Sequence, residues 1–112
     1  MLFRSRAHDA GLGVIVKEAL ANGRLTIRGA EPALLAYARD RDLPPDAVAI
    51  AAAISQPWSD VVLSGAVSPA MLHSNLRARE LVLEGARPAD ELPQLCLDGD
   101  AYWQRRSGLP WR

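Results

Sequence analysis

The sequence predicts an α/β fold in which short parallel strands alternate with helices. Two continuously apolar runs, at residues 14–16 (all β-branched) and 61–63, are typical of strands that are covered on both faces. Proline-initiated and alanine-rich helical patterns lie between and after these runs, and this alternation favours a parallel sheet. The 112 residues are enough for one domain at most.

The first segments are predicted to be a helix end, a strand and a turn. Residues 2–10 have helical spacing, and Gly11 suits the left-handed position after a helix. The strand at 14–16 is expected to be buried and to end near Glu18. Asn22-Gly23 marks a turn, with a hairpin to residues 24–28 as the weaker alternative.

Two helices are predicted next. Pro32 can open the first helix, because a proline at the first helical position loses no hydrogen bond. The second helix follows the Pro44-Pro45 break and runs over residues 47–55, before Pro57. It is apolar on every side, so we expect it to be buried all round. The apolar face of the first helix is Leu34, Leu35 and Ala38.

The second strand leads into the last long helix. Residues 65–67 form a small-residue turn, and Ser68-Pro69 is an N-cap followed by proline at the first helical position. The helix over residues 69–82 is expected to bury one stripe of leucines, and Gly85 and Pro88 end it. That stripe consists of Leu72, Leu76 and Leu83. One helical turn is expected near residues 91–95, before the aromatic end at Tyr102, Trp103 and Trp111.

Composition excludes several classes of function. The 13 basic and 13 acidic residues leave no basic excess for nucleic acid or for a charged membrane surface. No apolar run reaches the roughly 18 residues of a membrane span. A single cysteine, Cys96, excludes a disulfide framework and a Cys-rich zinc site. We therefore expect a cytoplasmic protein with neither nucleic acid nor membrane as a partner.

The turn between the second strand and its helix is the strongest candidate binding site. At such a junction, backbone N–H groups and the positive end of the helix dipole can hold a phosphate. The glycine at 65 would let a ligand approach the backbone. The alternative is a tight connection in which the glycine serves only the geometry of the chain.

Other reactive side chains favour structural roles. Lys17 stands at a strand end, where a Schiff-base role is possible but a solvated or ion-paired lysine is the favoured interpretation. His8 and His73 lack a metal-binding partner at helical spacing and are interpreted as surface residues, and Cys96 is expected to fill space. We expect the aromatic and basic tail to pack on the protein rather than to stack on single-stranded nucleic acid. No metal motif, P-loop or Ser-His-Asp set is present.

Four segments resemble the aldo/keto reductase family, in the family's order and spacing. The first is similar to the family's seventh strand and following loop, and the second to its buried seventh helix. The third resembles the eighth strand, its loop and its helix, and the fourth a C-terminal ending found in some members. Their sequences are GVIVKEALANGRLT (13–26), PDAVAIAAAISQ (45–56), VVLSGAVSPAMLHSN (61–75) and YWQRRSGLPW (102–111).

The resemblance implies the C-terminal part of a (β/α)8 barrel. We expect residues 1–112 to form about two to three βα units of an unclosed barrel, with residues 84–112 as a tail that packs on the body. A barrel of this kind needs about 250 residues, so the chain would be a C-terminal fragment.

The resemblance also implies an NADP(H) site. In the family, the loop and helix after the last strand hold the adenosine phosphate, which carries over as backbone contacts at Gly65 and Ala66 and an adenine contact at Asn75. Leu20 and Gly23 would lie along the cofactor. The predicted cofactor-binding residues are Leu20, Gly23, Ser64, Gly65, Ala66, Met71, Ser74 and Asn75.

Some positions depart from the family's pattern. Met71 stands where Gln or Arg commonly faces the cofactor, Ser74 where Glu is usual, Ser64 in place of a proline, and Lys17 where many members carry an aromatic residue. These departures leave the preference for NADPH open. The family's catalytic Asp, Tyr, Lys and His have no counterpart, so no catalytic residue is predicted.

The function implied is the cofactor-binding portion of a reductase that transfers a hydride between NADPH and a small aldehyde or ketone. The chain alone is expected to be inactive. The alternative is a non-catalytic α/β module that binds a nucleotide or pairs with another chain. Open strand edges would then invite strand addition or self-association.

Overall fold

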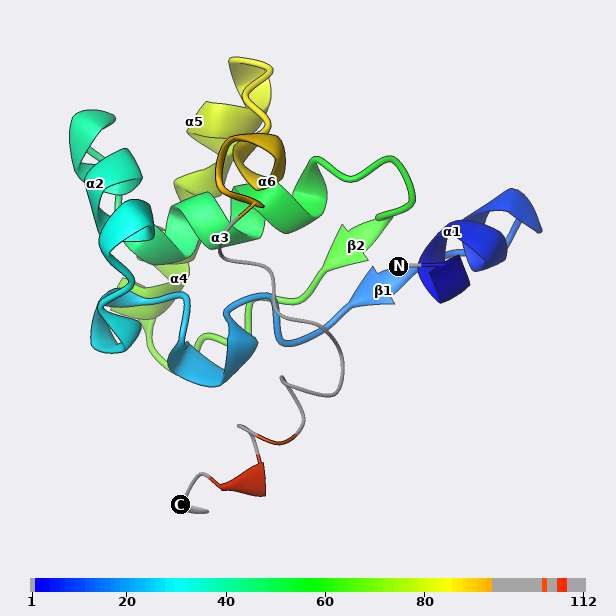
Figure 1. Ribbon diagram of the computed structural model, residues 1–112, viewed down its shortest axis with the longest axis horizontal. Coiled ribbons are helices and arrows are strands. Elements are labelled where there is room, and N and C mark those ends of the chain that lie inside the picture. Colours follow the sequence, from blue (N-terminus) through cyan, green and yellow to red (C-terminus); the bar gives the residue numbers. More distant parts are fainter. Residues whose placement is uncertain (1, 94–103, 105–106, 109–112) are drawn as a thin grey trace.

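The computed structural model describes residues 2–93, 104 and 107–108, and helices dominate it (Figure 1). Two short 3₁₀ turns, Ala21–Gly23 and Ile27–Gly29, follow the first strand. The helices and strands in chain order are α1 (Leu2–Asp9), β1 (Ile15–Val16), α2 (Pro32–Asp40), α3 (Pro45–Ile54), β2 (Val61–Val62), α4 (Pro69–Leu76), α5 (Ala78–Leu83) and α6 (Pro88–Glu91).

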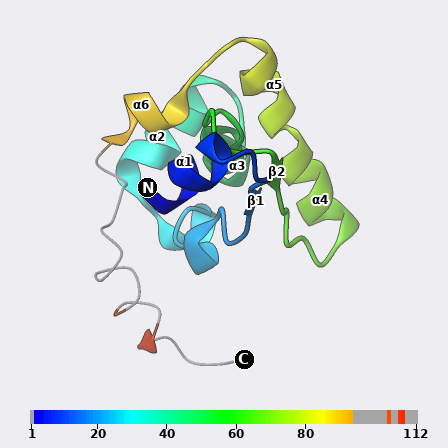
Figure 2. The same ribbon diagram turned by 90° about the vertical axis from the view of Figure 1, so that its right-hand side faces the viewer.

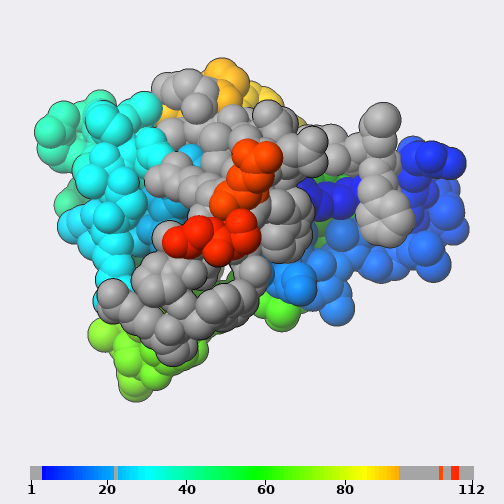
Figure 3. Space-filling model, turned by 60° about the horizontal axis from the view of Figure 1, so that its bottom comes forward, coloured from blue at the N-terminus to red at the C-terminus, as the bar shows by residue number. Residues whose placement is uncertain are grey.

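The predicted helix end is confirmed at α1. Gly11 has a φ of +83°, and the Leu12 N–H donates to the Ala7 carbonyl at 3.0 Å, which closes the helix in a left-handed turn. Arg4 lies over the ring of the buried Trp58, 5.2 Å from its centroid. In the space-filling view, the blue N-terminal residues lie at one end of the molecule and the cyan residues around the start of α2 at the other (Figure 3).

The two predicted strands form a parallel pair. Ile15 is opposite Val61, and Val16 is opposite Val62. Asp60 links the segments that lead into the two strands, because its Oδ2 accepts the Val14 N–H at 2.6 Å. The alternative hairpin does not form, since residues 27–29 adopt a 3₁₀ turn.

Helix α3 lies at the centre of the core. Figure 2 shows α4 and α5 on one side of α3, and α2 and α6 on the other. The small alanine side chains of α3 allow neighbouring helices to approach closely. Its first half is buried as predicted, but Ile54 at its end is 39% exposed. The core residues around it include Leu34, Tyr37, Ala38, Leu43, Val48, Ile50, Ala78, Leu81 and Leu92.

The predicted fold class is wrong. The described residues form a helical assembly with one two-stranded sheet, and not a C-terminal part of a (β/α)8 barrel with two to three βα units. The apolar runs are in the expected places, but Ile15 is 66% exposed, and Val61 and Leu63 are each 50% exposed. Two-residue strands with half-exposed side chains do not build a sheet covered on both faces. Packing of helices on α3 builds the core instead.

The leucine stripe of the last long helix, which was expected to be buried, is instead exposed. Leu72, Leu76 and Leu83 are 44%, 60% and 75% exposed. The buried residues of α4 and α5 are Asn75, Ala78 and Leu81. The expected continuous helix over residues 69–82 is divided at Arg77 into α4 and α5.

The start of the predicted tail contacts the helical core. Helix α6 packs against α3, and its Glu91 forms an ion pair with Arg41 at the end of α2, with 3.2 Å between Oε2 and Nη2. The helical turn expected near residues 91–95 begins and ends earlier, at Pro88 and Glu91. Cys96, Tyr102, Trp103 and Trp111 lie outside the described residues.

Candidate functional site

The predicted phosphate loop leads from β2 into a capped helix. Ser68 is extended, with φ −145° and ψ 156°, and its Oγ accepts the Met71 N–H at 3.2 Å. Pro69 has no N–H, and within the described residues the Ala70 N–H donates no hydrogen bond. The start of α4 therefore offers one backbone N–H and the Ser68 hydroxyl as donors, together with the positive end of the helix dipole.

A hollow of about 470 Å³ lies over this loop. Gly65 has a φ of +68°, and no atom beyond Gly65 and its two chain neighbours lies within 4 Å of the position that a Cβ would occupy there. A ligand can therefore approach the backbone at Gly65 closely. Neither lysine nor arginine is among the described residues that line this hollow, which are Ser64, Gly65, Ala66, Val67, Ser68, Pro69, Leu72 and His73.

A chain of hydrogen bonds supports the loop from beneath. The Ala66 N–H donates to Ser64 Oγ at 3.2 Å, and the Ser64 hydroxyl donates to Asn75 Oδ1 at 2.6 Å. Asn75 Nδ2 donates to Asp46 Oδ2 at 2.5 Å, and the Ser74 hydroxyl donates to Asp46 Oδ1 at 2.9 Å. The loop after β2 is thereby connected to the first turn of α3.

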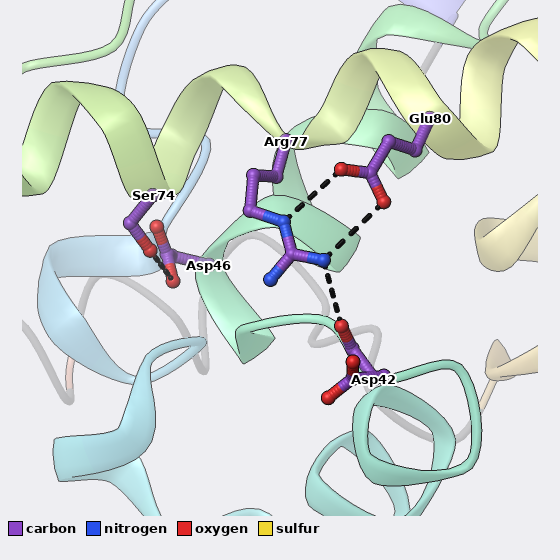
Figure 4. A network of polar contacts seen from close by, with 5 residues as sticks. All are labelled: Asp42, Asp46, Ser74, Arg77 and Glu80. Atoms are coloured by element: carbon purple, nitrogen blue, oxygen red, sulfur yellow. Dashed lines mark hydrogen bonds and ion pairs between the residues drawn. The ribbon is translucent and has the colours of Figure 1, made fainter.

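A second hollow, also about 470 Å³, lies between the end of α2 and the α4–α5 junction, and it shares His73 with the first. Arg77 is fixed beside it by Glu80 and by the backbone carbonyl of Asp42 (Figure 4). Hydrogen bonding to Glu80 raises the pKa of Arg77 above its ordinary value. The carboxylates of Asp42 and Glu80 balance the charges of Arg39 and Arg77 here, so this hollow does not form a concentrated cationic site.

The predicted cofactor-binding residues do not all line the same hollow. Ser64, Gly65 and Ala66 line the hollow over the loop. Asn75 lies behind them, 6% exposed, with its amide turned toward Asp46 and Ser64. Ser74 lines the second hollow.

The remaining predicted contacts do not line the loop hollow. Leu20 packs against the hydrophobic core, Gly23 ends a 3₁₀ turn, and Met71 is 43% exposed on α4. Lys17 is exposed just after β1, and His8 is exposed in the last turn of α1.

Sequence reasoning missed two contributors. His73 is exposed, as expected for a surface residue, but it also lines both hollows, a position that its sequence context does not indicate. Asp46 joins the hydrogen-bond chain from 29 residues before Asn75. The only local signal for Asp46 was an acidic residue in the first turn of a helix, which is a common stabilising feature with no functional meaning of its own.

Within residues 2–93, 104 and 107–108, no group of three or more His, Cys, Asp or Glu side chains could hold a metal ion. Over the same residues, no helix is long and apolar enough to cross a membrane.

Comparisons with known proteins add no family. No protein-family model matches the chain, and none of the curated proteins compared with it matches significantly.

Proposed function

We propose that this chain binds the adenosine-phosphate part of NADP(H) at the loop over residues 64–68, as the cofactor-binding portion of an aldo/keto reductase. The observation that carries the proposal is the hollow over Gly65, where the backbone is open to a ligand next to the capped start of α4. The hollow is large enough to admit a phosphate group, and the donors beside it can hydrogen-bond to phosphate oxygens. The resemblance of residues 61–75 to the family's last strand, loop and helix supports the same place.

The expected affinity is modest. Arginine and lysine are missing from the described lining of the hollow, so binding rests on the Ala70 N–H, the Ser68 hydroxyl and the helix dipole. A dipole contact of this kind contributes about 0.3–1 kcal/mol at an exposed site. In a complete reductase the cofactor supplies the hydride, whereas this chain would only hold and orient it.

Titration of the full chain with NADPH, followed by calorimetry, tests the proposal. The informative variant is Gly65→Asp, which places a carboxylate in the hollow and is expected to weaken binding by at least about tenfold. Gly85→Asp is the matched control, because Gly85 also has a positive φ, +76°, and open space around its Cβ position, but lies at the end of α5. Equal affinities of the two variants would contradict a site at Gly65.

The chain alone is not expected to reduce carbonyls. The reason is that no residues here correspond to the family's catalytic Asp, Tyr, Lys and His. Oxidation of NADPH by the purified chain with any of a panel of aldehydes and ketones would contradict this expectation.

A partner-pairing module is the second candidate function. The exposed leucines of α4 and α5 line an apolar recess of about 280 Å³ between α3, β2, α4 and α5, and Val62 on β2 also lines it. Exposed apolar surface beside an open strand edge is suited to association, and a net charge of zero does not oppose it.

Sedimentation equilibrium distinguishes this second function. Leu76→Arg is expected to abolish self-association if the recess carries it. Ile27→Arg is the control, since Ile27 is 74% exposed and is not among the residues lining the recess. A wild-type chain that stays monomeric at all concentrations would remove self-pairing as a function.

A further inference from the structure

Asp46 lies in the first turn of α3 but forms its side-chain hydrogen bonds with another helix. Its side chain does not cap α3 in the described structure but reaches across to α4, where it accepts hydrogen bonds from both Ser74 and Asn75. The N-cap of α3 is Pro44, whose side chain makes no capping hydrogen bond. Both oxygens of Asp46 are therefore used to hold another helix.

The charge on Asp46 determines the orientation of the Asn75 amide. An ionised carboxylate only accepts hydrogen bonds, so the group of Asn75 that faces it must be the NH2 group. The Oδ1 atom of Asn75 then faces Ser64, 2.6 Å away, and it also can only accept. The Ser64 hydroxyl must therefore point its proton at Asn75, which leaves its oxygen to accept from the Ala66 N–H at 3.2 Å.

This chain of hydrogen bonds, in which each donor and acceptor is fixed, ends at the turn that lines the hollow. Ser64 and Ala66 flank Gly65, the residue with a φ of +68° over which a ligand would approach. Because Asn75 is only 6% exposed, water does not readily replace its partners. A change at Asp46 is thus transmitted to the turn through two side chains.

We infer that Asp46 is a positioning residue for the loop: through Asn75 and Ser64, it holds the turn at residues 64–66 in the shape that forms the hollow. This inference rests on the proposed function only where it concerns cofactor affinity. The chain of hydrogen bonds itself acts with or without a ligand.

The test compares Asp46→Asn with Asp42→Asn in the full chain. Both substitutions replace a carboxylate by an amide. Asp42 bonds to Arg77 through its backbone carbonyl and not through its side chain (Figure 4). It is not part of the chain to Ser64, so Asp42→Asn is a matched control. The first measurement is the solvent-exchange rate of the Ala66 amide by NMR, without ligand. The second is the dissociation constant for NADPH.

Asp46→Asn is expected to speed Ala66 amide exchange and to weaken NADPH binding, each by about tenfold, as for loss of a charge-assisted hydrogen bond. Asp42→Asn is expected to change each value by less than about twofold. If the two variants alter Ala66 exchange equally, the inference is wrong. A wild-type chain that does not bind NADPH would contradict the proposed function, while Ala66 exchange would still decide the role of Asp46.

Ser64→Ala provides a second route if Asp46→Asn prevents folding. It interrupts the same chain at the loop and leaves α3 intact, so Ala66 exchange should again rise by about tenfold. Unchanged Ala66 exchange in Ser64→Ala would also overturn the inference.

Discussion

The guanidinium of Arg77 donates a hydrogen bond to the backbone carbonyl of Asp42, with 2.8 Å between Nη2 and the oxygen. The same guanidinium binds Glu80, 3.1 Å from Nε to Oε1 (Figure 4). Asp42 itself has a φ of +54°, in the left-handed region that non-glycine residues seldom adopt. Arg77 thus ties the junction of α4 and α5 to a strained turn after α2.

Arg77→Lys should lower the midpoint of thermal unfolding slightly. A lysine keeps the charge, but its single ammonium group cannot bond the Glu80 carboxylate and the Asp42 carbonyl in the same fork geometry. Arg79→Lys is the control and should leave the midpoint unchanged. Added salt should weaken only the Glu80 contact, because the Asp42 carbonyl is neutral. Equal midpoints for the two variants would show that the Arg77 contacts do not stabilise the fold.

Tyr37 should make the free energy of unfolding depend on pH above about 10, the ordinary pKa of a tyrosine. Burial raises the pKa of Tyr37, the nearby Glu91 carboxylate adds to this, and Arg41 opposes it. The unfolded state then releases its proton first, so the free energy of unfolding is fully retained below about pH 10 and falls as the pH rises beyond that value. Denaturant titrations of wild type and Tyr37→Phe between pH 7 and 11 measure the difference.

Tyr37→Phe should change the free energy of unfolding little at pH 7. The Tyr37 hydroxyl is buried near the Glu91 carboxylate but makes no hydrogen bond of normal geometry with any described residue, so its removal breaks no well-formed bond. We expect Tyr37→Phe to be neutral or slightly more stable at pH 7 and to lose less stability than wild type above pH 10. A parallel decline of the two proteins would show that Tyr37 ionises as it does in water.

Gly29→Ala should lower the free energy of unfolding, whereas Ala30→Gly should raise it. A Cβ at Gly29 would lie 1.8 Å from the Arg24 carbonyl oxygen and 2.5 Å from its carbon, so Gly29→Ala should cost about 1–3 kcal/mol. Ala30 has a φ of +50°, and Ala30→Gly should gain roughly 0.5–1 kcal/mol by relieving that conformation. Urea denaturation gives both values, and a destabilised Ala30→Gly would contradict the second.

Leu81 and Leu83 should differ sharply although they are two residues apart. Leu81 is 1% exposed and packs against the core around α3, so Leu81→Ala should cost about 2–5 kcal/mol. Leu83 is 75% exposed, and Leu83→Ala should remain within about 0.5 kcal/mol of wild type. Chemical unfolding of the two variants at one protein concentration checks this, and a large loss for Leu83→Ala would indicate that a partner covers it.

Features with a local chemical cause could be predicted from the sequence. Pro32 and Pro69 occupy the first positions of α2 and α4, and Ser68 caps α4 through the Met71 N–H. The two apolar runs pair in parallel as expected. At the two prolines and at the Ser68 cap, the residue itself or its immediate neighbours decide the conformation, whereas the strand pairing also needs a partner 46 residues away.

Features that depend on distant partners could not be predicted. The continuous apolar run at residues 61–63 indicates that burial is favourable, but not that this chain supplies two layers to cover it, and Leu63 stays half exposed. Periodicity likewise predicted that Leu76 rather than Asn75 would be buried. Burial of Asn75 depends on Asp46, which lies 29 residues away in the sequence and supplies a hydrogen bond that no local pattern reveals.

The register of the sheet has a kinetic consequence. Pairing Ile15 with Val61 closes a loop of 46 residues, which costs about 3 kcal/mol of chain entropy if the loop is flexible. The contacts between α2 and α3 close far shorter loops. We therefore expect α2 and α3 to dock early in folding and the strands to join late, when the docked helices have already shortened the path between them.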